Sequence, residues 1–431
     1  MPTARRERAA RDRASCGRWP GPVDESVGYD VLVLDAGYKQ SVAIARSLAR
    51  AGLRVAMGDS IVEFLPWLAH PVFRSRYSSW TVVLPSYAHD GAEFAGAVID
   101  FVRAHPTRVI IPTGDASIAA LTPRRDQLAE LGCVLAVASE AALKIANDKE
   151  LTLAIAAQLG IAQPASIQID NIDDLAVAMA KLDFPFVLKP TVSWTGQSAE
   201  RVRPIEVVDE TEATTATERF LAAGARVLAQ QWACGRREGV TLFIVGDEVR
   251  ASFAHLEHRT TPPLGGASVV RESIPMPEDI YTASVRLVRE IGLQGACEVE
   301  FRRDADDRPL LMEINARATG TIENAIAAGI DFPLMIWQWA TGVTVHSVAT
   351  YRSGVRMRWL RGDVRWLREN HGRAGRPDSV SRTRALLVFS AEFARTWHYD
   401  FFDWRDLGPA VADMLNMTAK ARRPTRPRLS A

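Results

Sequence analysis

The chain has 431 residues, of which 47% are hydrophobic and 24% are charged, and its formal net charge is +1. This length predicts roughly two or three domains, and the near-neutral charge gives no reason to expect a nucleic acid partner. The four cysteines form no CxxC pair, and no apolar run reaches the ~18 residues of a membrane span. We therefore expect a cytoplasmic protein with neither a disulfide framework nor a transmembrane segment.

The N-terminal third alternates short apolar runs with helical patterns. Residues 1–28 are Arg-rich and lack the apolar core of a signal peptide, so we expect a disordered leader. Residues 29–145 contain four runs typical of buried strands, "YDVLVLDAG", "LRVAMGDS", "TRVIIPTGD" and "GCVLAVAS", with helical patterns between them. This alternation predicts a right-handed, doubly wound parallel sheet.

Such a sheet raises the alternative of an NAD-dependent oxidoreductase. Asp59 follows Gly37 by 22 residues, close to the spacing of a ribose-binding acid. However, the turn "DAGYKQ" contains one glycine rather than the three of GxGxxG. Dinucleotide binding therefore remains the weaker interpretation of this domain.

The pattern changes from Asn147 onward. A helix is expected in "NDKELTLAIAAQLG" and strands in "FPFVLKP", "RVLAQQWACG" and "EGVTLFIVGDEVRASFAHLEH", the last with a hairpin turn at Gly246–Asp247. The loop "TTPPLGGASVV" and a helix over about 280–291 follow. Residues 346–431 are rich in Trp and Arg and are expected to form a C-terminal extension. The segment "RTWHYDFFDW" and the basic tail "AKARRPTRPRLSA" are expected to form a packed aromatic cluster with a frayed tail, and contact with a membrane surface is the alternative.

The stretch "ACEVEFRRDADDRPLLMEINARA" predicts an antiparallel hairpin with its turn in "DADDRP". Only one register puts the apolar residues on one face and the acids on the other. That register places these residues opposite each other: Glu298 and Asn315, Val299 and Ile314, Glu300 and Glu313, Phe301 and Met312. Two like charges directly opposite each other destabilise a sheet, so something must offset their repulsion.

A divalent cation is the simplest way to offset it. Two carboxylates, Glu300 and Glu313, and the amide of Asn315 are hard ligands that suit Mg²⁺ or Mn²⁺ better than Zn²⁺. Arg317 lies two residues beyond Asn315 on the same face, where it could meet phosphate oxygens. The alternative is a solvated amphipathic hairpin without a ligand.

These strands, "CEVEF" and "LLMEINAR", resemble the paired metal strands of the ATP-grasp superfamily of carboxylate-activating ligases. The resemblance extends from about residue 28 to about 345. It implies that Glu300, Glu313 and Asn315 hold Mg²⁺ and that Arg317 contacts phosphate. It also implies an α/β fold, in which a parallel pre-ATP-grasp domain (29–145) precedes an ATP-grasp domain of two subdomains (146–345) with nucleotide between them.

The same resemblance extends to two upstream lysines. Lys149, in "NDKELTL", and Lys189, in "FPFVLKP", match the nucleotide-binding lysines of the family. Only six of the 52 basic residues are Lys, so each one is informative. A lysine inside an apolar strand needs a counter-charge, which a triphosphate supplies. For Lys149, a solvated position on a helix is the alternative.

Further nucleotide contacts are implied between these lysines and the hairpin. The segment "VLAQQWACG" resembles the hinge strand, whose backbone binds adenine; the family usually has Glu at the position of Gln231, so we favour a backbone role there. Glu238 is a candidate ribose-binding or metal-proximal acid, with a plain surface residue as the alternative. The phosphate loop "TVSWTGQSAER" departs from the family in having a single glycine. The cofactor-binding candidates are Lys149, Lys189, Ser193, Gly196, Ser198, Gln230, Gln231, Trp232 and Glu238.

Two more arginines, Arg259 and Arg271, flank the Gly-Gly loop, where basic residues of the family commonly bind the carboxylate or acyl phosphate. With Arg317 they are the catalytic candidates. The resemblance implies an ATP- and Mg²⁺-dependent ligase that activates a carboxylate as an acyl phosphate for attack by an amine, in small-molecule or cell-surface polysaccharide metabolism. A non-catalytic ATP-binding regulator or assembly protein is the other alternative. The expected partners are a small carboxylate, an amine and, as an option, a second copy of the chain.

Overall fold

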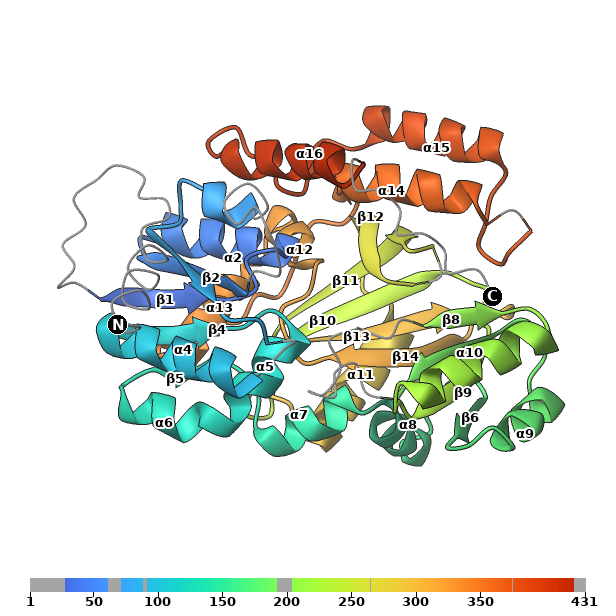
Figure 1. Ribbon diagram of the computed structural model, residues 1–431. Helices are drawn as coiled ribbons and strands as arrows, with labels where there is room; N and C mark the ends of the chain where they lie inside the picture. The colour runs from blue at the N-terminus through green and yellow to red at the C-terminus, as the bar shows by residue number, and fades with distance from the viewer. Residues whose placement is uncertain are drawn as a thin grey trace, which may run out of the picture.

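The computed structural model describes residues 28–60, 71–87, 91–191, 204–263, 265–373 and 375–421, with only the backbone of 417–421. The expected leader therefore lies outside the described residues, except for Gly28. The described part of the chain contains three sheets, with five, seven and four strands. Figure 1 shows the five-stranded sheet at one end, the seven-stranded sheet in the middle and the four-stranded sheet at the other end. No helix in the described ranges is long and apolar enough to cross a membrane.

The N-terminal sheet is parallel throughout and has the strand order β3-β2-β1-β4-β5. This confirms the predicted doubly wound sheet. Because helices cover it, its inner strands are apolar and fully buried along their length, as in Val31–Val33. The strands are β1 (Tyr29–Val33), β2 (Val55–Ser60), β3 (Trp80–Leu84), β4 (Thr107–Ile111) and β5 (Val134–Leu135). The helices are α2 (Lys39–Arg50), η1 (Pro71–Arg74), α4 (Gly91–Ala104), α5 (Asp115–Leu121), η2 (Thr122–Arg124) and α6 (Arg125–Glu130).

A small antiparallel sheet follows, with the order β6-β9-β7-β8. Two helices, α9 (Asp174–Lys181) and α10 (Glu210–Ala222), bury its apolar side chains, including Phe186 and Phe220. Helices α7 (Glu140–Asn147) and α8 (Lys149–Gln158) connect it to the N-terminal sheet. The strands are β6 (Ser166–Ile169), β7 (Phe186–Pro190), β8 (Ile205–Val207) and β9 (Val227–Gln231).

The central sheet has the order β14-β13-β10-β11-β12-β15-β16 and is antiparallel except for its last pair. Its first strands are β10 (Arg237–Val245), β11 (Glu248–Thr261), β12 (Ala267–Ser273), β13 (Gly295–Arg303) and β14 (Pro309–Asn315). The turn between β10 and β11 is at Gly246–Asp247, as predicted, because Val245 pairs with Glu248. Helix α11 (Glu278–Ile291) packs its apolar side against the back of this sheet.

The C-terminal region contributes to the same sheet. Strands β15 (Arg356–Arg358) and β16 (His398–Tyr399) continue it beyond β12. Helices α12 (Ile322–Ala328) and α13 (Phe332–Ala340) precede them, and α14 (Leu360–His371), α15 (Arg382–Arg395) and α16 (Gly408–Ala421) form the layer at the top of Figure 1. The predicted division at residue 345 stays a prediction, but the sheet itself continues across it.

The β13–β14 hairpin has the predicted register where the acids lie. Glu298 pairs with Asn315, Val299 with Ile314, and Glu300 with Glu313. The prediction that Phe301 faces Met312 is wrong, because a bulge after Glu300 shifts Phe301 onto Leu311. The N–H of Leu311 donates to the carbonyl of Ala162 at 2.8 Å, and its side chain is buried beside Phe301. The bulge therefore keeps both the acidic face and the apolar face intact.

Candidate active site

The polar face of the central sheet carries the predicted metal residues. Glu300 and Glu313 lie directly opposite each other on β13 and β14. The amide of Asn315 donates to the Glu300 carboxylate at 2.7 Å. Gly239 on β10 is the other neighbour of Glu300, so β10 places no side chain against that carboxylate. The structure thus brings the two acids and the amide into one cluster.

Two lysines from other elements approach this cluster. Lys149 is the first residue of α8, whose N-cap is Asp148, and its Nζ lies 3.3 Å from a carboxylate oxygen of Glu313. Lys189 lies on β7, is 6% exposed, and donates from Nζ to Oε1 of Gln230 at 2.7 Å. The small sheet and α8 therefore deliver the two predicted nucleotide-binding lysines to the acidic hairpin.

The charges in this cluster perturb one another. Burial, together with the nearby Lys149 ammonium, lowers the pKa of Lys189 to about 7 against the opposing effect of Glu313. Burial also raises the pKa of Glu300 well above its usual range, and the facing Glu313 carboxylate adds to this rise. Burial acts in the same direction on Glu313, but the two lysines outweigh it and lower its pKa. The acid pair thus favours one negative charge over two until a cation is supplied.

Arg317 extends the cluster toward the N-terminal sheet. Its Nε donates to Asp115 at 2.5 Å, and its Nη2 donates to Asp115 at 3.2 Å and to the Asn315 amide oxygen at 3.1 Å. Burial opposes the charge of the guanidinium, but the Asp115 ion pair outweighs it and raises the pKa of Arg317. Asp115 is the first residue of α5, which follows β4. The sequence analysis did not select this acid, although it is the last residue of the predicted strand segment "TRVIIPTGD" and so lies at the carboxyl end of a parallel strand.

Glu298 is a second acid that the sequence analysis did not select. It is buried beside the cluster and accepts hydrogen bonds from Thr241 at 3.1 Å, from Thr319 at 2.8 Å, and from Thr321. Its period-2 spacing from Glu300 was a usable signal. Because hydroxyl groups already surround this carboxylate, we interpret Glu298 as a residue that fixes the loop after β14.

The hinge segment is only partly available for the predicted contacts. Gln230 is buried, accepts from Lys189 and donates to Ser166 at 3.0 Å. The N–H of Gln231 donates to Ala165, and its side chain bonds to the backbone of Asp183. The predicted backbone role of this segment in adenine binding stays a prediction, and the side chain of Gln231 is engaged elsewhere. Trp232 lies just beyond β9, with its ring 4.5 Å from the guanidinium of Arg302.

Four predicted cofactor-binding residues remain, namely Glu238 and three residues of the phosphate loop. Glu238 is 5% exposed and accepts from Arg303 at 2.8 Å and from Arg236 at 3.2 Å, so its ribose-binding role has no support either. Ser193, Gly196 and Ser198 lie outside the described residues.

Arg259 and Arg271, the two predicted substrate-binding arginines, are engaged in buried ion pairs. Arg259 donates to Asp363 at 2.8 and 2.7 Å, and Arg271, which is fully buried, donates to Asp400 at 2.6 and 2.8 Å. Both acids lie in the C-terminal region, whose approach to this sheet the sequence pattern did not reveal. These contacts point to a structural role for both arginines and away from the predicted catalytic role.

The C-terminal region also connects the central sheet to the small sheet. Asp378 accepts from Arg302 and, at 3.5 Å, from Arg237 on the polar face of the central sheet. Arg376 donates to Glu212 on α10 at 2.8 Å. The loop between α14 and α15 thus contacts both the central sheet and the subdomain of the small sheet.

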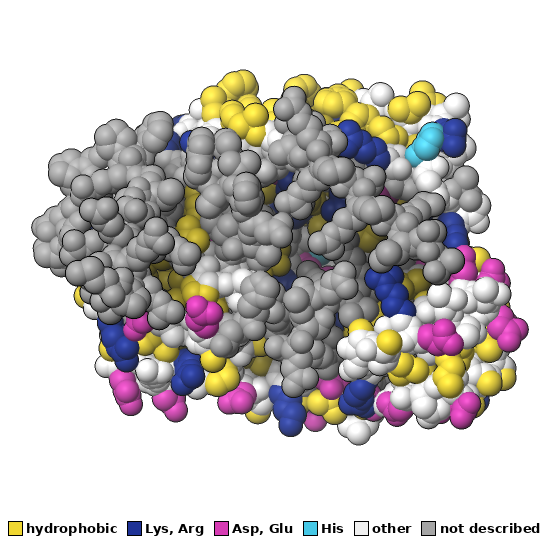
Figure 2. All heavy atoms as spheres, viewed as in Figure 1, with side chains coloured by type: hydrophobic (Ala, Val, Ile, Leu, Met, Phe, Trp, Pro, Cys, Tyr) yellow, Lys and Arg dark blue, Asp and Glu magenta, His cyan; other side chains and the backbone are white. Residues whose placement is uncertain are grey.

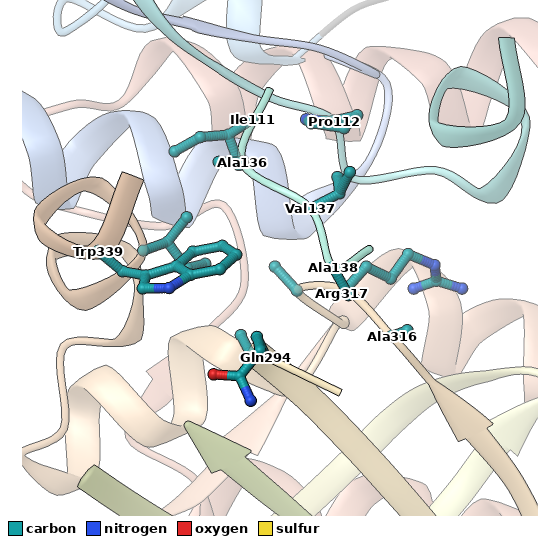
Figure 3. Close-up of a pocket in the computed structure, with 12 residues that line it drawn as sticks. Ile111, Pro112, Ala136, Val137, Ala138, Gln294, Ala316, Arg317 and Trp339 are labelled. Atoms are coloured by element: carbon teal, nitrogen blue, oxygen red, sulfur yellow. The ribbon is translucent and has the colours of Figure 1, made fainter. Parts of the chain in front are cut away.

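A small pocket lies beside the acid cluster and shares Arg317 with it. It is lined mainly by apolar side chains from the end of β4, the segments after β5 and β14, β13 and α13, with Gln294 and Arg317 as polar exceptions. In Figure 3 the guanidinium of Arg317 points away from Trp339 and out of this pocket. With a lining of this kind the pocket does not suit a charged nucleotide, so we assign the candidate site to the hairpin cluster instead.

The donor set of the cluster fits a hard divalent cation. No group of three or more His, Cys, Asp or Glu within the described residues could hold a metal ion. Two carboxylates with one amide oxygen form a smaller set, which suits Mg²⁺ because this ion keeps several water or phosphate ligands. The raised pKa of Glu300 supports the fit, since a cation between the two acids would remove the repulsion that raises it.

The comparisons with known proteins agree with this architecture. Residues 265–362 match a family described as "ATP-grasp in the biosynthetic pathway with Ter operon". The chain is 25% identical over 195 residues to a D-alanine–D-alanine ligase of Methylococcus capsulatus, an alignment that covers 41% of this chain and 60% of that one. It is also 25% identical to the arginine-specific carbamoyl phosphate synthase large chain of Cutaneotrichosporon cutaneum, covering 41% of this chain and 15% of that one. The alignments thus span less than two thirds of either relative.

Solved structures show the same fold. An L-amino acid ligase from Bacillus licheniformis superposes with a TM-score of 0.56 and 18% identity, covering 73% of this chain and 74% of that one. N5-carboxyaminoimidazole synthetase from Staphylococcus aureus, in complex with ADP, superposes with a TM-score of 0.60 and 14% identity, covering 85% and 97%. The fold is a parallel α/β domain followed by two α+β subdomains. Residues 265–362 match an ATP-grasp family and the described residues share the ATP-grasp fold, as the resemblance of the hairpin predicted.

Proposed function

We propose that this protein is an ATP- and Mg²⁺-dependent ligase that joins a carboxylate to an amine. The observation that carries the proposal is the opposition of Glu300 and Glu313, with Asn315 beside them and two lysines approaching from α8 and β7. A protein that needed only a stable hairpin would gain nothing from two facing acids. A protein that positions a metal–triphosphate complex needs both acids and the surrounding cations.

The residues of the cluster have separate roles in this proposal. Glu300, Glu313 and Asn315 would hold Mg²⁺, which neutralises phosphate charge as the γ-phosphoryl group passes to the substrate carboxylate. Lys149 and Lys189 lie beside the acids, where their ammonium groups would bind the phosphate oxygens and position the triphosphate for in-line transfer.

Arg317 is placed on the far side of Asn315, at the border with the N-terminal sheet. Its guanidinium is oriented by Asp115, so it has a fixed direction before any ligand binds. We assign it to stabilising the charge that develops on the transferred phosphoryl group. The acyl phosphate that results is open to attack by an amine, and the new bond is an amide.

The nature of the substrates is supported only by analogy. Two of the similar proteins are named as ligases of amino acids, a D-alanine–D-alanine ligase and an L-amino acid ligase. We therefore favour a small amino acid or peptide-like amide as the product, with amide formation on a cell-surface polysaccharide as the second candidate. The crevice at the carboxyl ends of the N-terminal strands, next to Asp115, is the proposed position of the substrate carboxylate.

Phosphate release in the presence of a panel of carboxylates and amines tests this proposal. We expect release only when ATP, Mg²⁺, one carboxylate and one amine are all present, and mass spectrometry of that mixture should detect the amide. ATP binding without release under any combination would instead favour the non-catalytic alternative. Binding of NAD rather than ATP in a calorimetric titration would favour the oxidoreductase alternative.

A further inference from the structure

The outer face of the C-terminal helices is apolar over α15, the segment after it, and α16. Six side chains define what we call the C-terminal apolar surface: Leu387, Phe393, Trp397, Trp404, Val411 and Met414. Trp397 is 83% exposed, Trp404 is 81% exposed and Leu387 is 70% exposed. Figure 2 shows hydrophobic side chains along the upper edge of the molecule, above the α14–α16 layer of Figure 1.

This surface is not the packing face of the helices. Ala385 on α15 is buried against Val269 and Trp366, and Ala412 on α16 is also buried. Both helices therefore already have an apolar side docked on the protein. A surface helix normally turns polar residues outward, so large apolar groups on the outer side indicate a second binding partner.

The acidic and the basic side chains of this region differ in their contacts and exposure. All five acids between residues 380 and 416 form ion pairs with arginines of the protein body. These pairs are Glu392 with Arg356, Asp400 with Arg271, Asp403 with Arg50, Asp406 with Arg46, and Asp413 with Arg361. Four arginines of the same segment are instead exposed: Arg382, Arg384, Arg395 and Arg405.

The outward charge of the segment is therefore positive, and the sequence continues this trend. After Asp413 the chain contains one Lys and four Arg but no acid. Exposed aromatic and aliphatic groups in the same segment as four exposed arginines match a bilayer that carries negative headgroups. A second copy of the chain fits less well, because a two-fold contact through this surface would bring the arginines of both copies together.

We propose that the C-terminal apolar surface docks the protein on an anionic lipid bilayer. Trp397 and Trp404 would enter the headgroup region, and Arg382, Arg384, Arg395 and Arg405 would contact lipid phosphates. The residues of the candidate active site lie on other elements, so the proposed docking surface does not include them. This inference is independent of the proposed reaction.

Flotation of the full-length protein with vesicles tests the proposal. Vesicles of phosphatidylcholine are compared with vesicles that contain 30% phosphatidylglycerol, at low and at high salt. We expect binding to the anionic vesicles at least tenfold above binding to the neutral ones, and we expect high salt to reduce it. A blue shift of tryptophan fluorescence should accompany binding.

Three variants locate the contact. The double variant W397Q/W404Q and the double variant R382Q/R384Q should each lose most of the vesicle binding. The matched control V83S/V177S removes two apolar groups that are exposed elsewhere, on β3 and α9, and should bind as the unmodified protein does. Circular dichroism and the unfolding midpoint serve as checks that all three variants are folded.

Three results would overturn the proposal. One is equal binding to neutral and anionic vesicles, and another is unchanged binding of W397Q/W404Q. The third is a dimer in light scattering that W397Q/W404Q converts to a monomer, because the surface would then be an interface between two copies.

Discussion

Glu313 faces Glu300 across the β13–β14 pair, and the Lys149 ammonium lies 3.3 Å from its carboxylate. Glu313 therefore has a cation beside it as well as the opposing acid, whereas the main charge acting on Glu300 is the Glu313 carboxylate. This asymmetry accounts for the opposite directions in which the pKa values of the two carboxyl groups move. In the proposed function, Glu313 would therefore join the metal site to the phosphate site.

Replacing Glu313 with alanine should abolish ATP turnover and leave the fold intact. The loss should be at least about 100-fold, because the substitution removes a carboxylate ligand of the metal that neutralises transferred charge. Phosphate release and circular dichroism measure the two effects. D306N, in the exposed turn of the same hairpin, is the matched control and should retain full activity; near-normal turnover of E313A would refute the metal assignment.

Replacing Lys189 with alanine should weaken ATP binding by roughly tenfold or more, because one charge-assisted hydrogen bond to phosphate is lost. Isothermal titration calorimetry measures the affinity. K181A is the control, since Lys181 is exposed at the end of α9, on the same subdomain. If the two variants bound ATP equally well, Lys189 would not belong to the site.

ATP affinity should also fall as the pH rises. The pKa of Lys189 is about 7 in the free protein, chiefly because of burial, so the ammonium loses its proton as the pH rises through 7. Phosphate binds the charged form, so binding above pH 7 should take up a proton and weaken by roughly tenfold between pH 6.5 and 8.5. Calorimetry in buffers of different ionisation enthalpy detects the proton, and K189A should lose this dependence. A pH-independent affinity would mean that Lys189 stays charged.

The buried pair of Arg271 and Asp400 should contribute to stability rather than to catalysis. Removing one partner leaves the other charge buried and alone, so R271M and D400N should each lower the free energy of unfolding by about 3–5 kcal/mol. Denaturant unfolding measures this loss. D306N breaks an exposed pair with Arg308 and should change stability by less than about 1 kcal/mol. An R271M protein of normal stability with no ligase activity would restore the catalytic interpretation.

The sequence predicted the parts of this molecule that depend on local periodicity. The register of Glu298, Glu300 and their partners follows from the separation of polar and apolar faces, and the structure has it. At the bulge that moves Phe301 onto Leu311, the N–H of Leu311 donates to the distant Ala162 carbonyl. Such a contact between distant segments leaves no periodic signal in the strand itself.

The ion pairs of the two arginines could not be predicted for the same physical reason. Arg259 and Asp363 are 104 residues apart, and Arg271 and Asp400 are 129 residues apart. A loop with two flanking arginines looks like an anion site when only neighbouring residues are considered. Asp363 lies on α14 and Asp400 directly follows the two-residue strand β16, and the sequence pattern does not show that either element packs against this sheet.

A crystal structure with a non-hydrolysable ATP analogue and Mn²⁺ tests the central claim most directly. Anomalous scattering locates the metal without reference to the protein. We predict a peak at direct coordination distance from the carboxylates of Glu300 and Glu313, with the triphosphate between that metal and the Nζ atoms of Lys149 and Lys189. A nucleotide bound at the end of β1, or a metal peak away from the two acids, would contradict the account.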